Sequence, residues 1–164
     1  MTVAGGLRTD APAVGTPPRA ASPVTAPVRI VGTPRRADDG SLSAATVCTA
    51  DPDEAFFAGH YPGFPIFPGV CVIECVHRSA LLVLPSARLA AIESARFRGP
   101  VLPGDELSVE LALTADSGGD SVSGGDSDGG GNRDGEAWRV AATVRTVRGT
   151  AATVRLRLTS GGLG

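Results

Sequence analysis

The sequence predicts an α+β fold in which a curved antiparallel sheet wraps around one long central helix. Two strand-like segments precede a single apolar run of helical length, and four strand-like segments follow it. The apolar run carries hydrophobic residues on more than one face, so it needs a sheet that encloses it. A chain of 164 residues with 42% hydrophobic content is sufficient for one domain with one core.

The expected strands are runs of β-branched and apolar residues that turn signals separate. The first two flank a turn at residues 37–40, where two aspartates precede a glycine. Gly149 and Thr150 mark the turn between the last two. The six expected strands are residues 28–33, 42–50, 89–97, 107–114, 138–147 and 151–158.

The expected helix covers residues 68–84. Pro68 suits a first helical position, because its ring fixes φ at a helical value and its missing N–H needs no partner there. Pro85 cannot continue the helix and ends it. Since the apolar residues of this segment are not confined to one stripe, we expect it to be buried on most sides.

Two segments bury too little apolar surface to offset the entropy of ordering them. Residues 1–27 carry five prolines among small residues, and we expect a disordered tail there. Residues 116–136 mix glycine, serine and aspartate, and we expect a flexible loop between two strands. A single domain over residues 28–160 remains.

Composition and charge exclude several classes of function. The formal net charge of −2 gives no electrostatic footprint for nucleic acid, and the absence of lysine excludes Schiff-base chemistry. No apolar run reaches the roughly 18 to 20 residues of a membrane span, and no secretory signal opens the chain. We therefore expect a cytoplasmic protein without membrane contact. The chain has three cysteines, an odd number, and no two of them have CxxC spacing, so we expect reduced thiols and no bound metal. They are Cys48, Cys71 and Cys75.

Five of the seven aromatic residues lie within twelve positions, directly before the expected helix and around His60. They form either a packed loop that covers one end of the helix or the wall of an apolar pocket. These five are Phe56, Phe57, Tyr61, Phe64 and Phe67.

This segment resembles a known signature. Residues 56–62 read Phe-Phe-Ala-Gly-His-Tyr-Pro, residues 65–70 read Pro-Ile-Phe-Pro-Gly-Val, and Glu74 follows. The pattern is similar to that of the bacterial 3-hydroxyacyl-(acyl carrier protein) dehydratases, and residues 95–105 resemble the strand and turn after the helix in that family. The resemblance runs from about residue 28 to 160, without the loop.

The resemblance implies a hot-dog fold and a homodimer or trimer of dimers. In such a dimer the histidine of one subunit faces the helix carboxylate of the other. The substrate would arrive on the phosphopantetheine of an acyl carrier protein, with its acyl chain in an apolar tunnel beside the helix, and no separate cofactor is needed. We assign that tunnel to Phe64, Phe67, Pro68 and Ile73.

Elimination of water from a 3-hydroxyacyl thioester needs a base, a group for the departing hydroxide and a stabiliser for the enolate-like oxygen. A neutral imidazole at His60 can take the α-proton. Glu74 can protonate the departing hydroxide or, as a carboxylate, position the departing water. The N–H groups of Gly69 and Val70 at the helix start can hold the thioester oxygen.

Two residues near Glu74 depart from the family. Arg78 stands where the family usually has glutamine, and His77 replaces a small apolar residue. Arg78 could form a surface ion pair with Glu74, four residues earlier, and would then modulate its acidity. We expect His77 to be an ordinary polar helix position.

Arg96 and Arg98 alternate along a strand and therefore lie on one face. They could meet the acidic surface of an acyl carrier protein, or they could be a solvated strand face.

The function that these residues predict is dehydration of (3R)-3-hydroxyacyl-(acyl carrier protein) thioesters to trans-2-enoyl thioesters, in fatty-acid or polyketide-type synthesis. A hot-dog acyl thioesterase is the nearest enzymatic alternative. A non-catalytic acyl-binding or partner subunit is the alternative from another class.

Overall fold

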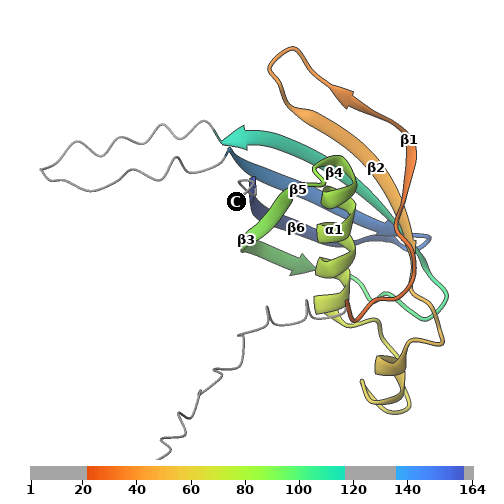
Figure 1. Cartoon of the computed structure of the whole chain (residues 1–164). Helices are drawn as coiled ribbons and strands as arrows, with labels where there is room; N and C mark the ends of the chain where they lie inside the picture. The colour runs from red at the N-terminus through yellow and green to blue at the C-terminus, as the bar shows by residue number, and fades with distance from the viewer. Residues whose placement is uncertain (1–21, 117–135, 161–164) are drawn as a thin grey trace, which may run out of the picture.

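One six-stranded antiparallel sheet curves around a single long helix (Figure 1). The computed structural model describes residues 22–116 and 136–160. The strands lie in the order β1-β2-β4-β5-β6-β3. The helices are η1 (Ala55–Ala58) and α1 (Gly69–Val83), and the strands are β1 (Arg29–Arg36), β2 (Leu42–Thr49), β3 (Ala87–Phe97), β4 (Glu106–Asp116), β5 (Ala137–Thr146) and β6 (Gly149–Ser160). The predicted α+β hot-dog arrangement is confirmed.

The core lies between α1 and the concave face of the sheet. On β4 every second residue from Leu107 to Leu113 is buried, and the neighbours between them face outward. α1 contacts all six strands, as a helix with apolar residues on several faces requires. Its buried residues are Cys71, Val72, Cys75, Val76, Ser79 and Ala80. With 15 residues α1 is too short to cross a bilayer, and no other helix in the described ranges is long and apolar enough to do so.

The predicted elements are present, with shifted ends. α1 starts one residue after Pro68, which is its N-cap, and Leu84 is its C-cap. The last turn was placed too late. Thr146 pairs with Gly149, so the turn is Val147 and Arg148, and Gly149 already belongs to β6.

Residues 22–27 do not behave as the disordered tail that composition predicted. Val24 and Ala26 are buried in the same core as α1. The N–H groups of Thr25 and Ala26 and the Thr25 hydroxyl donate to Oε1 of the buried Glu54. This prediction was wrong for residues 22–27 because side chains distant in sequence satisfy the backbone here. Residues 1–21, and residues 117–135 of the predicted loop, lie outside the described residues.

The three cysteines are free and buried, as predicted. The Cys75 thiol donates to Cys48 Sγ at 3.3 Å, which joins α1 to β2. Burial raises the pKa of Cys71 to about 11, and the contact with Cys48 together with burial raises the pKa of Cys75. Both side chains therefore remain neutral thiols near pH 7 and pack as small core residues.

Replacement of Glu54 tests the attachment of residues 22–28. We expect Glu54→Ala to lower the free energy of unfolding by about 1 to 3 kcal/mol, since it leaves the N–H groups of Thr25 and of the buried Ala26 without an acceptor. Urea unfolding measures the change. Glu110→Ala removes an exposed glutamate 3.8 Å from Arg145 and is the control, with an expected loss of under about 0.5 kcal/mol. Equal losses from both variants would contradict this account.

Candidate active site

His60 is held by a backbone carbonyl. It lies two residues after the end of η1, and its Nδ1 is 3.1 Å from the carbonyl oxygen of Ile66. A carbonyl oxygen can only accept, so Nδ1 carries the proton. In the neutral ring Nε2 is then the bare nitrogen, which is the form that a general base needs.

Aromatic packing fixes the segment around His60. The rings of Phe56, Phe57 and Phe67 lie with centroids 4.9 to 6.0 Å apart. The Phe67 N–H donates to the carbonyl of Val101 at 2.7 Å, which ties the residues before α1 to the loop after β3. The packed-loop interpretation holds for these three rings, while Tyr61 and Phe64 are exposed.

Tyr61 has a φ of 54°, the left-handed region that a bulky side chain rarely adopts. Its carbonyl accepts the N–H of Phe64 at 3.0 Å, which closes a tight turn, and its ring meets the His60 imidazole edge-on. Such strain persists where the surrounding contacts enforce it and is common at functional sites.

A cavity of about 490 Å³ opens between His60, the start of α1 and the end of β3. Apolar side chains and backbone form most of its wall. Its lining residues are His60, Tyr61, Ile66, Phe67, Gly69, Val72, Phe97, Gly99, Pro100, Val101 and Ala151.

The first turn of α1, beside this cavity, contains backbone N–H groups without an acceptor in the described part of the chain. The N–H groups of Cys71 and Val72 are taken by the carbonyl of Pro68. Those of Gly69 and Val70 have no acceptor among the described residues, as expected for the first turn of a helix. Gly69 lines the cavity beside His60, so its N–H can hold an oxygen that becomes negative there.

Phe97 is a cavity residue that sequence reasoning did not assign. A Cβ built on Gly69 would lie 2.7 Å from Phe97 Cζ, so the ring covers the backbone at the helix start. Phe97 is nevertheless 52% exposed. Its place in the Ala-Arg-Phe-Arg-Gly-Pro segment, which was noted for its resemblance, is the signal that could have found it.

The four residues assigned to a tunnel divide into two groups. Phe67 lines the cavity, and Pro68 is buried beside it as the helix N-cap. Ile73 packs against the core, and Phe64 is 60% exposed. Neither of the last two lines the His60 cavity.

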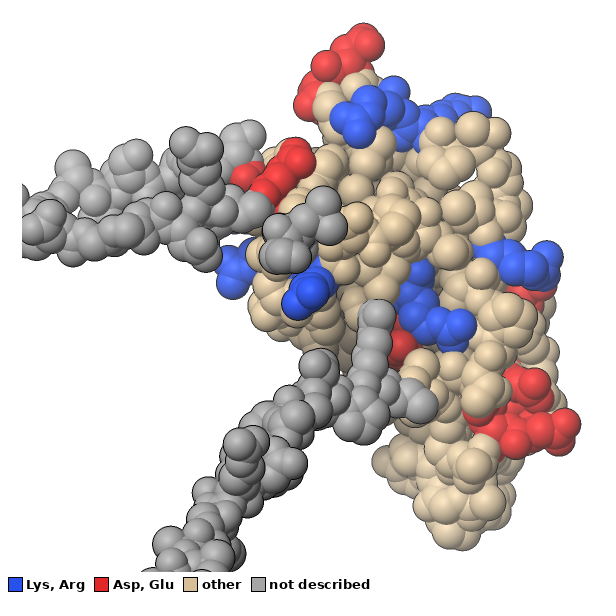
Figure 2. Space-filling model, in the orientation of Figure 1, with Lys and Arg blue, Asp and Glu red and all other residues tan. Residues whose placement is uncertain are grey.

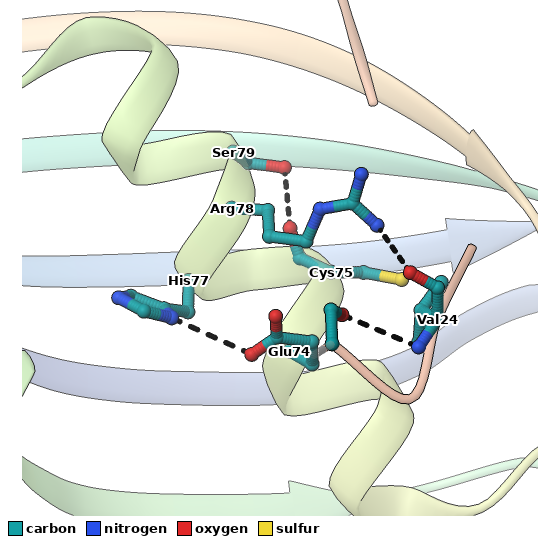
Figure 3. Close-up of polar contacts among 7 residues, drawn as sticks. Val24, Glu74, Cys75, His77, Arg78 and Ser79 are labelled. Atoms are coloured by element: carbon teal, nitrogen blue, oxygen red, sulfur yellow. Dashed lines mark hydrogen bonds and ion pairs between the residues drawn. The ribbon is translucent and has the colours of Figure 1, made fainter. Parts of the chain in front are cut away.

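Glu74 lies one helical turn further along α1 and is absent from the lining of the His60 cavity. Its Oε2 is 3.5 Å from Nδ1 of His77, and both side chains are mostly buried. A single chain thus places His60 with Gly69 in one cavity and pairs Glu74 with His77 (Figure 3).

Arg78 does not form the expected ion pair with Glu74. Its guanidinium donates to the carbonyls of Val24 and Ala26, both at 2.9 Å, and so fastens residues 22–28 to α1. Figure 3 shows His77 and Arg78 directed to opposite sides of the helix. The i, i+4 spacing predicted a contact, but the nearby carbonyls are the partners that Arg78 takes.

Arg96 and Arg98 lie on the outer face of the sheet, opposite the core. With Arg155 they line a hollow of about 580 Å³, together with the hydroxyl groups of Ser94 and Thr153. None of these three arginines pairs with an acidic residue in the described ranges, and Glu110, in the same hollow, lies 3.8 Å from Arg145. On the face seen in Figure 2 the charged groups are small and separate.

β3 is an edge of the sheet and leaves apolar side chains uncovered. Leu89, Ile92 and Phe97 pair with Leu158, Leu156 and Ala152 of β6, which are buried, so they lie on the core side. All three are nonetheless more than a third exposed. An uncovered apolar edge of this kind is typical of an interface between chains.

Comparison with known proteins decides the family. The ApeI-like family, described as ApeI dehydratase, matches residues 36–123, which is more than half of the chain. The chain belongs to the ApeI-like dehydratase family. The matched residues include the segment around His60 and all of β2, α1, β3 and β4.

Curated relatives of this ApeI-like chain are named 3-hydroxyacyl-[acyl-carrier-protein] dehydratase FabZ. The protein from Polynucleobacter necessarius subsp. necessarius is 43% identical over 75 residues, which are 41% of this chain and 50% of that protein. The one from Symbiobacterium thermophilum is 45% identical over 71 residues, or 38% and 50%. The chain spans about half the length of the curated relatives it matches.

Among solved structures, the dehydratase heterocomplex ApeI:P from Xenorhabdus doucetiae aligns with a TM-score of 0.50 and 22% identity, over 71% of this ApeI-like chain and 87% of that one. At this identity the likeness shows the fold.

The contact between Gly69 and Phe97 can be tested by a double-mutant cycle. We expect Gly69→Ala to cost more stability in the natural chain than in a Phe97→Ala background, with a coupling on the order of 1 kcal/mol, because the added methyl collides with the ring. Thermal and urea unfolding of the four proteins give the coupling. Additive effects would show that the ring does not cover Gly69.

Proposed function

We propose that this protein dehydrates 3-hydroxyacyl thioesters carried by an acyl carrier protein, giving trans-2-enoyl thioesters in fatty-acid or polyketide-type synthesis. The observation that carries the proposal is His60 with its Nδ1 on the Ile66 carbonyl, in an apolar cavity that also contains the helix-start residue Gly69. Membership of a dehydratase family and the FabZ relatives support the same reaction. The cytoplasm is the compartment we propose, and the chemistry requires no cofactor beyond the carrier's phosphopantetheine.

The chain's own groups supply what the elimination needs. Nε2 of His60 takes the α-proton, and the Gly69 N–H stabilises the enolate-like oxygen of the thioester. The electron pair of the broken C–H bond then forms the Cα=Cβ bond while the Cβ–O bond breaks. The departing hydroxide acquires a proton and leaves as water.

Two chains complete the site in this proposal. Glu74 does not line the His60 cavity of its own chain, and β3 presents an uncovered apolar edge. We propose a homodimer, alone or as a trimer of dimers, in which the Glu74 of one subunit meets the His60 cavity of the other. The uncovered β3 edge would be part of the interface.

The base and the carboxyl group are tested by substitution. We expect His60→Ala and Glu74→Gln each to lower the rate of enoyl formation from a 3-hydroxyacyl-carrier substrate by about 10²- to 10⁴-fold. Absorbance of the enoyl thioester measures the rate, and free thiol is assayed in parallel. Release of thiol from 3-hydroxyacyl and saturated substrates alike would show a thioesterase instead. If the natural chain binds an acyl thioester but does not turn it over, the protein is a binding subunit.

Complementation tests the shared site with the same variants. Mixed dimers of His60→Ala and Glu74→Gln subunits contain one intact site, so unfolding and refolding of an equal mixture should restore roughly a quarter of natural activity. Each variant refolded alone is the control. No recovery in dimers shown by mass spectrometry to be mixed would place both residues of a site on one chain.

Arg96 and Arg98 are the residues that we propose for carrier docking. The hollow on the outer face of the sheet brings them together with Arg155, and no described acidic residue pairs with any of the three. Unpaired guanidinium groups at one surface attract an acidic partner and speed its association. The end of β3 thus exposes Arg98 on one face while Phe97 and Gly99 line the cavity on the other.

We expect Arg96→Ala/Arg98→Ala to raise KM for the carrier-bound substrate about three- to tenfold, and more than KM for the same acyl group on a short thiol. The loss should shrink as salt rises, because salt screens exposed charges. Arg35→Ala/Arg36→Ala removes two exposed arginines of β1 and is the control. An equal rise in KM from both double variants would contradict docking at the hollow.

A further inference from the structure

His77 is the polar side chain of α1 whose environment an ordinary surface position does not explain. It lies three residues after Glu74, with Nδ1 3.5 Å from Glu74 Oε2, at the long end of hydrogen-bond range. The side chain is only 17% exposed. Its second nitrogen, Nε2, is buried and has no hydrogen-bond partner among the described residues.

The two nitrogens restrict which protonation state fits. A protonated imidazolium, or the neutral ring with its proton on Nε2, would bury an N–H donor without an acceptor. The neutral ring with its proton on Nδ1 leaves only a bare lone pair at Nε2 and aims the N–H at the Glu74 carboxylate. This tautomer leaves no buried N–H of the ring without an acceptor.

The same count disfavours a protonated Glu74 that donates to Nδ1, and an N–H donated to a carboxyl group favours its ionised form. If Glu74 were protonated and donated to Nδ1, the proton of His77 would be on Nε2, again buried without an acceptor. Arg78 does not compete, since its guanidinium is bound to the carbonyls of Val24 and Ala26 on the other side of the helix (Figure 3).

We propose that His77 is a positioning residue that donates its Nδ1–H to Glu74, holds Glu74 as a carboxylate and leaves Oε1 free for the substrate. This inference rests on the proposed dehydration and chooses between the two roles open to Glu74. An ionised Glu74 cannot supply a proton. It accepts a hydrogen bond from the 3-hydroxyl group and orients it, as the water-positioning role requires.

The proton balance then involves His60 alone. Its Nε2 takes the α-proton, the Cβ–O bond breaks, and the resulting imidazolium returns the same proton to the departing hydroxide. Water leaves, and both His60 and Glu74 regain their starting states.

Nitrogen NMR of the free protein tests the inference without any substrate. The chain has two histidines, so protein labelled with ¹⁵N-histidine gives two ring patterns, and His60→Asn assigns them. At neutral pH we expect His77 to be protonated at Nδ1 and bare at Nε2. Glu74→Ala should shift the Nδ1 resonance of His77, because it removes the acceptor of that N–H. A His77 ring protonated at Nε2, or at both nitrogens, in the natural protein would overturn the proposal even if dehydration is observed.

Kinetics of matched variants supply the second readout. An asparagine amide can place an N–H near the position of Nδ1, whereas alanine cannot. We expect His77→Ala to lower kcat by about ten- to a hundredfold with KM changed less than about twofold, and His77→Asn to recover most of the loss. Leu82→Ala, at an exposed position of the same helix, is the control. Equal losses of kcat in His77→Ala and His77→Asn, with folding intact, would contradict a positioning role.

If the natural protein dehydrates no 3-hydroxyacyl thioester, the proposed function fails. The NMR result then still decides whether His77 and Glu74 are paired as described.

Discussion

Enclosure of α1 by the sheet forces each polar side chain on that helix to find a partner close by. Ser79 donates to the carbonyl of Cys75 and meets the hydroxyl of Thr46, and all of these groups are buried. Arg78 takes two carbonyls from residues 22–28. His77 has Glu74. A polar group buried without a partner is costly, so these pairings decide where side chains of the site can point.

The same constraint separates the two groups of the proposed reaction. His60 is positioned by local contacts, since the Ile66 carbonyl holds its ring and Phe67 ties the segment to Val101. Glu74 is positioned by the helix and by His77, and it is absent from the His60 cavity. In the proposed dimer a second chain would bring the two groups together, and the exposed apolar residues of β3 would lie in the interface.

Residues at the end of β3 contribute alternately to the His60 cavity and to the hollow on the outer face of the sheet. Phe97 lies over Gly69 on the core side, while Arg96 and Arg98 line the outer hollow. Because successive side chains of a strand face opposite ways, one short stretch can contact an acyl chain on one side and an acidic carrier on the other. A carrier bound at the outer hollow would be one strand away from the His60 cavity.

The sequence by itself determined the element order, the single central helix, the free thiols and the segment that holds His60, because local periodicity, turn residues and a dense motif encode them. Only the tertiary structure decided where polar groups find partners. Composition assigned Val24 and Ala26 to a tail, yet Glu54 and Arg78, distant in sequence, bind their backbone. The i, i+4 spacing favoured an ion pair between Glu74 and Arg78, and His77 was expected to be an ordinary polar position of the helix. In the structure the partner of Glu74 is the mostly buried His77. Burial and long-range hydrogen bonds depend on contacts that no local pattern records.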